Sequence, residues 1–291
     1  MIKEIRKFFK TNDVLIQLIA VNVAVFLLYH IVHLFYFLFA AENMFRLYDW
    51  LAAPSDINTL LARPWTLITY AFFHKEIFHL LFNMLWLYWF GTIFRVYFDR
   101  RLLINVYIFG SLAGVLLYVF SYNVFPVFAT AKHISSMCGA SAGVFAVVLA
   151  ISCYVPKYTL NLFIFGRVKL VYIALFSVGL DIISISMSDN TGGHIAHLGG
   201  AFFGYLFAVN IRKGKDITFW FTKLCEYFGG VFKRKPKMKV AYKKSPTDDK
   251  EYNRQKNENQ QEIDRILDKI SKGGYDSLTK KEKETLFSQK K

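Results

Sequence analysis

Six stretches of this chain are long and apolar enough to cross a lipid bilayer, and this feature limits the possible folds more than any other. They cover roughly residues 14–39, 77–95, 102–121, 137–154, 170–188 and 193–211 of a chain of 291 residues that is 54% hydrophobic. A cleaved signal peptide is the alternative for the first stretch, but its apolar run of about 26 residues is longer than a signal sequence needs. The sequence therefore predicts an all-α, polytopic membrane protein, a bundle of six transmembrane helices.

Lys and Arg side chains predict the orientation, because they concentrate in cytoplasmic loops. They are dense in residues 1–13, 95–101 and 155–169 and sparse, for their length, in 40–76, 122–136 and 189–192. We therefore expect both termini in the cytoplasm, with the even-numbered helices running inward from the outer face of the cell's inner (plasma) membrane. Residues 1–13 are then a cytoplasmic segment, and residues 14–212 are the membrane domain.

The segment that follows the membrane domain is basic. From Arg212 onward it holds 22 Lys and Arg against 12 Asp and Glu, a net charge of +10. A nucleic-acid-binding tail is one interpretation, but a basic segment beside a membrane ordinarily faces anionic lipid headgroups. No nucleic-acid partner is therefore expected. Residues 213–260 are polar and are predicted to form a flexible linker.

Residues 261–291 are predicted to form a small helical hairpin. Helical spacing relates the apolar residues Ile263, Ile266, Leu267 and Ile270. Gly273-Gly274 is a typical helix end, and Thr279 with Glu282 matches a capping box that opens a second helix. A unit this small is expected to dock on a cytoplasmic partner or a lipid surface rather than to catalyse a reaction.

A serine and a histidine occupy matching positions in two even-numbered helices. Ser141 lies in a G-x-S-x-G motif and His197 in an A-H-x-G-G motif. Each is expected about four residues inside its helix, roughly 6 Å below one membrane face. An α/β-hydrolase also uses G-x-S-x-G, but there a strand precedes the serine, whereas this motif opens an apolar helix. Histidine is the usual base that activates serine, so we predict Ser141 as nucleophile and His197 as base.

Small residues give the G-x-S-x-G motif a second interpretation, as a plain helix-packing surface. Gly199, Gly200 and Gly204 follow His197 and would let the fourth and sixth helices approach closely. That packing is also what a serine and an imidazole on separate helices need in order to meet.

Other polar residues are expected at the same level. His79 and Asn83 share one helix face and are predicted to stabilise an oxyanion, the alternative being hydrogen bonds between helices. Three further residues are predicted to line the site: Gly139, Ala140 and His194. His194 and His197 have a spacing that metal ligands use, but the sequence places no carboxylate or cysteine beside them, so no metal is expected.

Asp181 is the one acid well inside a predicted span. Because an ionisable group is costly in a bilayer, we expect it to bond within the last three helices or to face a water-filled depression. An orienting role toward a histidine is the less favoured alternative. On this interpretation Asp181→Asn keeps activity.

Taken together, these residues resemble the rhomboid family of intramembrane serine proteases, in its bacterial members. The resemblance covers roughly residues 14–212 and rests on Ser141, His197 and the H-x-x-x-N of His79 and Asn83. It implies a serine–histidine dyad that needs no third acid and no cofactor, and that cleaves transmembrane protein substrates within the lipid bilayer. Substrates with small residues at the cut and helix-weakening residues below it are also implied.

Two positions depart from the family pattern. Trp65 matches the tryptophan of a Trp-Arg motif in the first loop, but Thr66 follows it, and the Glu-x-Arg element at the end of the second helix is absent near Arg95. The departures bear on packing of the first loop more than on chemistry. A catalytically silent rhomboid-like binding protein is the alternative, and a small transporter is a weaker one, because transporters tend to show internal repeats. Tolerance of Ser141→Ala would favour either.

Overall fold

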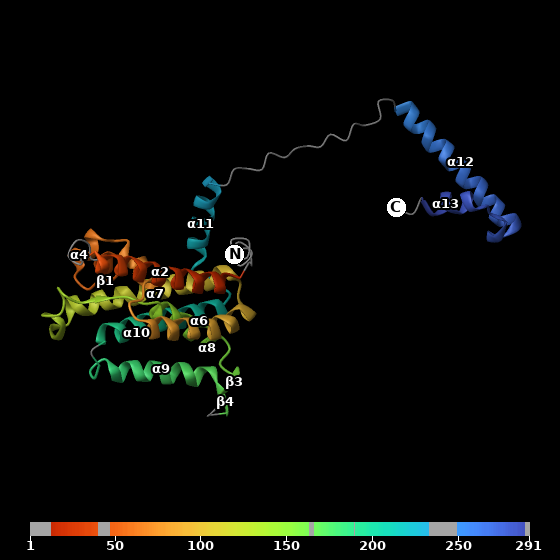
Figure 1. Cartoon of the computed structure of the whole chain (residues 1–291). Coiled ribbons are helices and arrows are strands. Elements are labelled where there is room, and N and C mark those ends of the chain that lie inside the picture. The colour runs from red at the N-terminus through yellow and green to blue at the C-terminus, as the bar shows by residue number, and fades with distance from the viewer. Residues whose placement is uncertain (1–12, 40–46, 163–165, 189, 233–248, 289–291) are drawn as a thin grey trace. The chain divides into compact units, whose positions relative to one another are not determined.

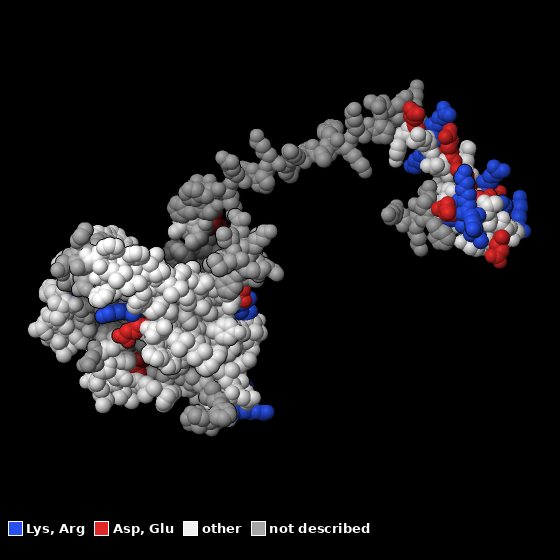
Figure 2. All heavy atoms as spheres, in the orientation of Figure 1, with Lys and Arg blue, Asp and Glu red and all other residues white. Residues whose placement is uncertain are grey.

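The computed structural model describes residues 13–39, 47–162, 166–188, 190–232 and 249–288. The chain forms two compact units, residues 1–232 and 233–291. Nearly all of the predicted cytoplasmic segment 1–13 lies outside the described residues. Figure 2 shows that charged side chains are scarce on the viewed face of the first unit. Such a surface suits a lipid environment.

Helices build the first unit (Figure 1). In the part of the chain that the structure describes, four helices are long and apolar enough to cross a membrane: α2 (Val14–Leu38), α6 (Ile77–Tyr97), α7 (Arg100–Val124) and α10 (Thr191–Arg212). Two further apolar helices are shorter, α8 (Ser141–Tyr154) and α9 (Leu170–Ser184). The predicted class, an all-α polytopic membrane protein, is confirmed, and six complete spans remain a prediction.

Helix α8 forms the centre of the bundle, and ten of its 14 residues are buried. Helices α6, α7, α9 and α10 all contact it. The contact with α10 is very close. A methyl group added at Gly200 would lie 2.0 Å from the Ala142 carbonyl oxygen, and one added at Gly204 would lie 2.3 Å from that of Ala146. The predicted approach of these two helices through small residues is therefore confirmed.

Short elements connect the helices. The first loop contains α3 (Leu47–Leu51), β1 (Ala53–Pro54), α4 (Ile57–Ala62), α5 (Thr66–Thr69) and η1 (Tyr70–Phe72). After α7 come η2 (Pro126–Phe128) and β2 (Ser136–Met137), and α8 connects to α9 through the antiparallel pair β3 (Thr159–Leu162) and β4 (Gly166–Lys169). Strand β2 pairs antiparallel with β1. The segment that leads into α8 is thus held by main-chain hydrogen bonds to the first loop.

The two departures from the family pattern have local partners in the structure. Trp65 stacks on Trp50 with 5.5 Å between ring centroids, and the Arg63 guanidinium lies 5.1 Å from the Trp50 ring. Thr66 is fully buried, and its hydroxyl donates to the Arg63 carbonyl oxygen at 2.7 Å. Arg95 pairs with Asp13, the N-cap of α2. The first loop is therefore packed without an arginine after Trp65.

The predicted linker 213–260 needs revision. It contains α11 (Phe219–Phe232), which packs on α7 within the first unit. The buried Asn105 amide donates to the hydroxyls of Thr218 and Thr222, at 2.9 Å in each case. The aromatic residues at the start of α11 give it an apolar face, which the surrounding Lys and Arg residues obscure in the sequence. Residues 249–260 belong to a later helix, α12 (Asp249–Gly273).

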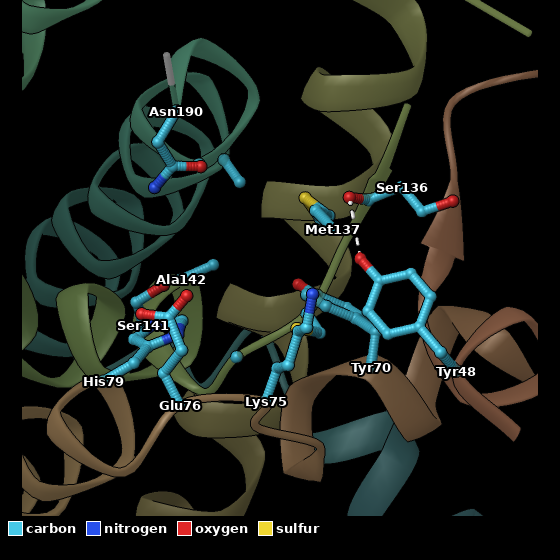
Figure 3. A pocket seen from close by; sticks show the side chains of 14 residues that line it. Tyr48, Tyr70, Lys75, Glu76, His79, Ser136, Met137, Ser141, Ala142 and Asn190 are labelled. Carbon is cyan, nitrogen blue, oxygen red and sulfur yellow. Dashed lines mark hydrogen bonds between the residues drawn. The ribbon is translucent and has the colours of Figure 1, made fainter. Parts of the chain in front are cut away.

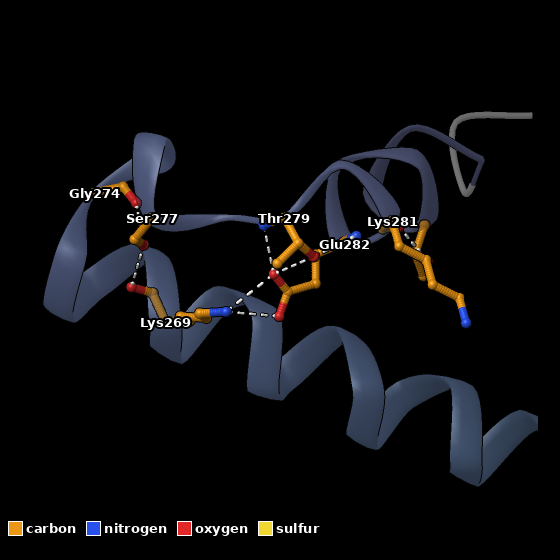
Figure 4. Close-up of polar contacts among 7 residues, drawn as sticks. Lys269, Gly274, Ser277, Thr279, Lys281 and Glu282 are labelled. Carbon is orange, nitrogen blue, oxygen red and sulfur yellow. Dashed lines mark hydrogen bonds and ion pairs between the residues drawn. The ribbon is translucent and has the colours of Figure 1, made fainter.

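The second unit consists of α12, η3 (Tyr275–Ser277) and α13 (Lys280–Ser288). Helix α12 ends at Gly273, and Gly274 has a φ of 71°, a left-handed conformation that favours glycine. Figure 4 shows the capping box at the start of α13: the Thr279 N–H donates to Glu282 at 2.7 Å. The Lys269 ammonium of α12 donates to both oxygens of the same carboxylate. These contacts join the two helices of the unit.

Candidate functional site

A cavity of about 420 Å³ lies where the first loop, the segment before α8 and the start of α10 meet. Figure 3 shows side chains that line it. Ser141, His79 and Gly139 are among them, together with Ala142 and Ala196. The structure therefore brings three of the predicted site residues to one cavity.

Ser141 is the first residue of α8, and not about four residues inside a helix as the sequence suggested. The residues before it are extended, because Ser136 and Met137 pair with β1. A helix of 14 residues spans about 21 Å, against about 30 Å of hydrocarbon in a bilayer. If α8 ends level with the other helices at one membrane face, Ser141 is recessed from the opposite face, and the cavity occupies the difference.

The start of α8 offers hydrogen-bond donors to this cavity. The N–H groups in the first turn of a helix have no acceptor in a preceding turn. Ala140, the N-cap residue, makes no side-chain capping hydrogen bond. The positive end of the helix dipole therefore lies beside the Ser141 hydroxyl, where it favours a developing negative charge.

Gly139 is a position where only glycine fits. Its φ is +130°, which L side chains rarely adopt, and an added methyl group would lie 2.5 Å from Cε1 of His79. Its N–H donates to the Tyr70 carbonyl oxygen at 2.9 Å. The backbone of the G-x-S-x-G motif is thus in direct contact with the His79 imidazole.

His74, which the sequence analysis did not single out, supports this arrangement. It is fully buried, and its Nε2 accepts from the Ala140 N–H at 3.2 Å. Burial lowers the pKa of His74 to about 3, so the ring is neutral and Nε2 is an acceptor. A histidine five residues before His79 matches no helical spacing, and its position just before α6 was the only signal in the sequence.

Asn83 is buried beside His74, away from the residues that line the cavity. Its amide nitrogen lies 3.3 Å from Nε2 of His74 and donates to the His79 carbonyl oxygen at 3.0 Å. The single lone pair of Nε2 already accepts from the Ala140 N–H, so Asn83 lies against His74 and is hydrogen-bonded to α6 through the His79 carbonyl oxygen. The prediction that Asn83 itself donates to an oxyanion is not supported by this geometry, whereas His79 lines the cavity.

His197 is held by two contacts. Its ring stacks on Phe145 with 4.5 Å between centroids and 12° between planes. Phe145 lies one helical turn after Ser141, so the stack places the imidazole against the face of α8 that carries the serine. On the other side, Nδ1 of His197 lies 2.9 Å from Oδ1 of Asp181. An ionised carboxylate only accepts, so Nδ1 carries the proton and Nε2 is left as the basic nitrogen.

Asp181 bonds within the last three helices, as expected from the sequence, but its partners are histidines, so the geometry favours the orienting role that was the less favoured alternative. Asp181, on α9, is 5% exposed, and its Oδ1 accepts from two imidazoles. The second is His194, whose Nδ1 lies 2.6 Å away and whose Nε2 lies 3.1 Å from the Ser188 hydroxyl. The carboxylate also overturns the argument that no acid lies beside the two histidines. Among the described residues, Asp181, His194 and His197 form a group whose ligand atoms all lie within 4.8 Å of one another.

Fold and site together define a polytopic helical membrane protein with a polar cavity built around the serine at the start of α8. Comparison with known proteins identifies its family. The Rhomboid domain model matches residues 61–214, and the chain belongs to the rhomboid family. A second model, a family of unknown function (DUF6576), matches residues 247–290, close to the bounds of the second unit.

Curated relatives agree with this assignment. The chain is 30% identical over 212 residues to RHOMBOID-like protein 12, mitochondrial, of Arabidopsis thaliana, which covers 70% of this chain and 60% of the relative. Over similar lengths it is 26% identical to the chloroplastic Rhomboid-like protein 16 of the same plant (70% and 64% coverage) and 28% identical to the mitochondrial Rhomboid protein 1 of Saccharomyces cerevisiae (72% and 57%). The match thus spans about 60% of each relative's length. These relatives belong to organelles, so they give no support to a bacterial source or a plasma membrane.

Proposed function

We propose that this protein is an intramembrane serine protease that hydrolyses peptide bonds in or near the transmembrane segments of membrane proteins. The observation that carries the proposal is the placement of Ser141 at the uncapped start of α8, on the helix face against which His197 is stacked. A nucleophile needs a base within reach, and this placement supports His197 as that base.

The proposed reaction follows from the contacts of each group. Nε2 of His197 takes the proton of the Ser141 hydroxyl while Oγ attacks the carbonyl carbon of the scissile bond. The oxyanion that forms accepts hydrogen bonds from His79 and from the N–H groups at the start of α8. His197 then returns the proton to the leaving amine, and water hydrolyses the acyl-serine. Asp181 stabilises the positive charge that His197 acquires.

The proposed topology places this chemistry at the membrane face opposite the termini. Arg212 donates to the carbonyl oxygen of Tyr154, the last residue of α8, whereas Ser141 is the first. Basic residues that face the cytoplasm would therefore put the cavity on the outer side. The bilayer and transmembrane proteins are the proposed partners of the first unit, and a cytoplasmic protein or a lipid surface is the proposed partner of the second.

A fluorophosphonate probe tests the proposal directly, because it reacts with an activated serine. The purified protein should be labelled at Ser141, as located by mass spectrometry, and heating before the reaction should abolish labelling. An absence of labelling in protein shown to be folded would contradict an activated serine at this position.

Gly139→Ala should abolish cleavage of a transmembrane substrate while the bundle stays folded. The unfavourable backbone conformation costs about 1–3 kcal/mol, and the added methyl group displaces His79. Gly214→Ala is the matched control, because Gly214 also has a positive φ but an added methyl group there meets nothing within 4 Å. Cleavage rates and thermal unfolding of both variants give the comparison. Equal activity of the two would show that contact between Gly139 and His79 is unimportant.

His79→Ala should lower the cleavage rate by about 10²–10³-fold, the usual loss when one oxyanion donor is removed. Asn83→Ala should cost less, because its amide is engaged with His74 and the His79 carbonyl oxygen. Single-turnover rates with one substrate measure both. A loss at Asn83 as large as at His79 would restore Asn83 as a direct donor.

A chain that ends after Phe232 should retain activity, because the first unit contains every residue of the proposed site. A chain that ends at Lys215 should be less stable, because it removes α11 and leaves the buried Asn105 amide without two acceptors. The loss of such partners costs about 1–3 kcal/mol. Thermal unfolding in detergent and specific activity of the two truncations test this. Inactivity of the longer one, once shown to be folded, would implicate the second unit in catalysis.

A further inference from the structure

We propose that Asp181, His194 and His197 bind one divalent transition-metal ion of the Zn²⁺ type, and that the bound ion reversibly inhibits the protease. The binding stands on the geometry of the three side chains alone. The inhibition rests on the function proposed above.

The three side chains supply a suitable donor set. Two imidazoles and one carboxylate are common ligands of Zn²⁺ and of Co²⁺, and three protein ligands leave a fourth position for water. Their ligand atoms lie within 4.8 Å of one another, and the two distances from imidazole nitrogen to Asp181 Oδ1 are 2.6 and 2.9 Å. Small rotations of the side chains admit an ion at the centre of this group, in place of the two shared hydrogens.

The Asp181 carboxylate provides an independent indication of a ligand. Its Oδ2 is buried and has no hydrogen-bond partner among the described residues. A buried carboxylate oxygen without a partner is costly, and coordination of an ion would satisfy it. The two histidines therefore share Oδ1 of Asp181, and Oδ2 is left to coordinate an ion.

The residues around the three proposed ligands fix the orientation of one histidine ring and leave a path from solvent. The Ser188 hydroxyl is hydrogen-bonded to Nε2 of His194, which turns Nδ1 of that ring toward Asp181. An outer hydrogen bond of this kind is typical of metal-binding histidines. Ser188 lies in the turn between α9 and α10, at the end of these helices where Asn190 and Gly193 line the cavity. An ion therefore has a short path from solvent.

Inhibition follows from the tautomer of His197. As a general base, the ring carries its proton on Nδ1 and accepts a proton from Ser141 at Nε2. Coordination at Nδ1 uses the lone pair of that nitrogen and moves the ring proton to Nε2. The imidazole then has no free lone pair to take the Ser141 proton, so the nucleophile is no longer activated.

Binding is best measured on full-length Ser141→Ala without a polyhistidine tag, because this variant keeps all three ligands and does not depend on cleavage. Titration with Co²⁺ should give visible absorption that saturates at one ion per chain and is displaced by Zn²⁺. Adding His194→Asn, or His194→Gln as a second choice for folding, should weaken binding by roughly tenfold or more. His133→Asn is the matched control, because the exposed His133 also lies beside a carboxylate, 3.6 Å from that of Asp56, but outside the proposed site. It should bind Co²⁺ normally.

Cleavage measures the second half of the proposal. Micromolar Zn²⁺ should inhibit the protein that retains Ser141, and a chelator should restore its rate of substrate cleavage. Each variant is compared with its own metal-free rate, and His194→Asn should need roughly tenfold more Zn²⁺. Unsaturable Co²⁺ binding, or equal binding by the folded His194 variants, would overturn the site. If the active enzyme binds Co²⁺ saturably but is not inhibited, the metal site stands and its inhibitory role is overturned. If the protein binds Co²⁺ but cleaves no substrate, the proposed protease function is overturned and the metal site stands.

Discussion

Ser141→Ala should lower cleavage of a transmembrane substrate by at least about 10⁴-fold, with the protein still folded in detergent. The loss is large because no other described hydroxyl combines the start of α8 with the face against which His197 is stacked. His197→Ala should cost a similar factor, and the double variant should be little worse than either, because the two residues act as a unit.

Cleavage rates of the two single variants and the double variant are compared on purified protein in detergent, and thermal unfolding shows that each variant is folded. Ser152→Ala is a suitable control, since Ser152 is fully buried on the same helix and its hydroxyl makes no hydrogen bond to any residue that the structure describes. Substantial cleavage by Ser141→Ala would eliminate the serine mechanism. It would favour a silent rhomboid-like binding protein, or a transporter, both of which tolerate the change.

Asp181→Asn should lower kcat by about 10²–10⁴-fold with little change in KM. The amide keeps the size of the carboxylate, but it loses the charge that stabilises protonated His197 and that fixes the hydrogen on Nδ1. This expectation replaces the one drawn from the sequence, in which the variant keeps activity, because Oδ1 of Asp181 lies 2.9 Å from that nitrogen.

Asp56→Asn provides the control for Asp181. Asp56 is also buried, at 7% exposure, but it caps α4 and lies in the first loop. Fluorophosphonate labelling should slow in Asp181→Asn and not in Asp56→Asn, a difference that a general loss of stability would not produce. Normal kcat in Asp181→Asn would show that packing against Phe145 alone positions His197.

The sequence predicts the main features of the site because they depend on local patterns. The apolar runs specify helices, and the small residues after His197 and around Ser141 specify which helices meet. The start of α8 was misplaced because hydropathy does not distinguish an apolar helix from an apolar strand: Met137 belongs to β2, whose pairing with β1 involves residues more than 80 positions away.

Contacts between distant helices were the part that the sequence did not predict. Asp181 looked isolated because its two partners lie 13 and 16 residues later, and the contact forms only when α9 packs beside α10. Helix α11 was missed for a different reason. Its basic surroundings favoured a linker, although the run Phe219-Trp220-Phe221 is an apolar signal.

Strands β1 and β2 pair through main-chain hydrogen bonds, so the position of Ser141 does not depend directly on which side chains these strands carry. Main-chain atoms of Ala53 and Pro54 hold the segment that precedes Ser141. The side chains of Ser136 and Met137 line the cavity and take no part in that pairing. Substitution of Ser136, which belongs to no core cluster of the described residues, can therefore change the wall of the cavity with Ser141 in place, whereas Met137 also packs in the core with Ala53 and Tyr70. In a rhomboid-family protein built this way, the lining of the cavity can change without a change in the main chain that leads to the serine.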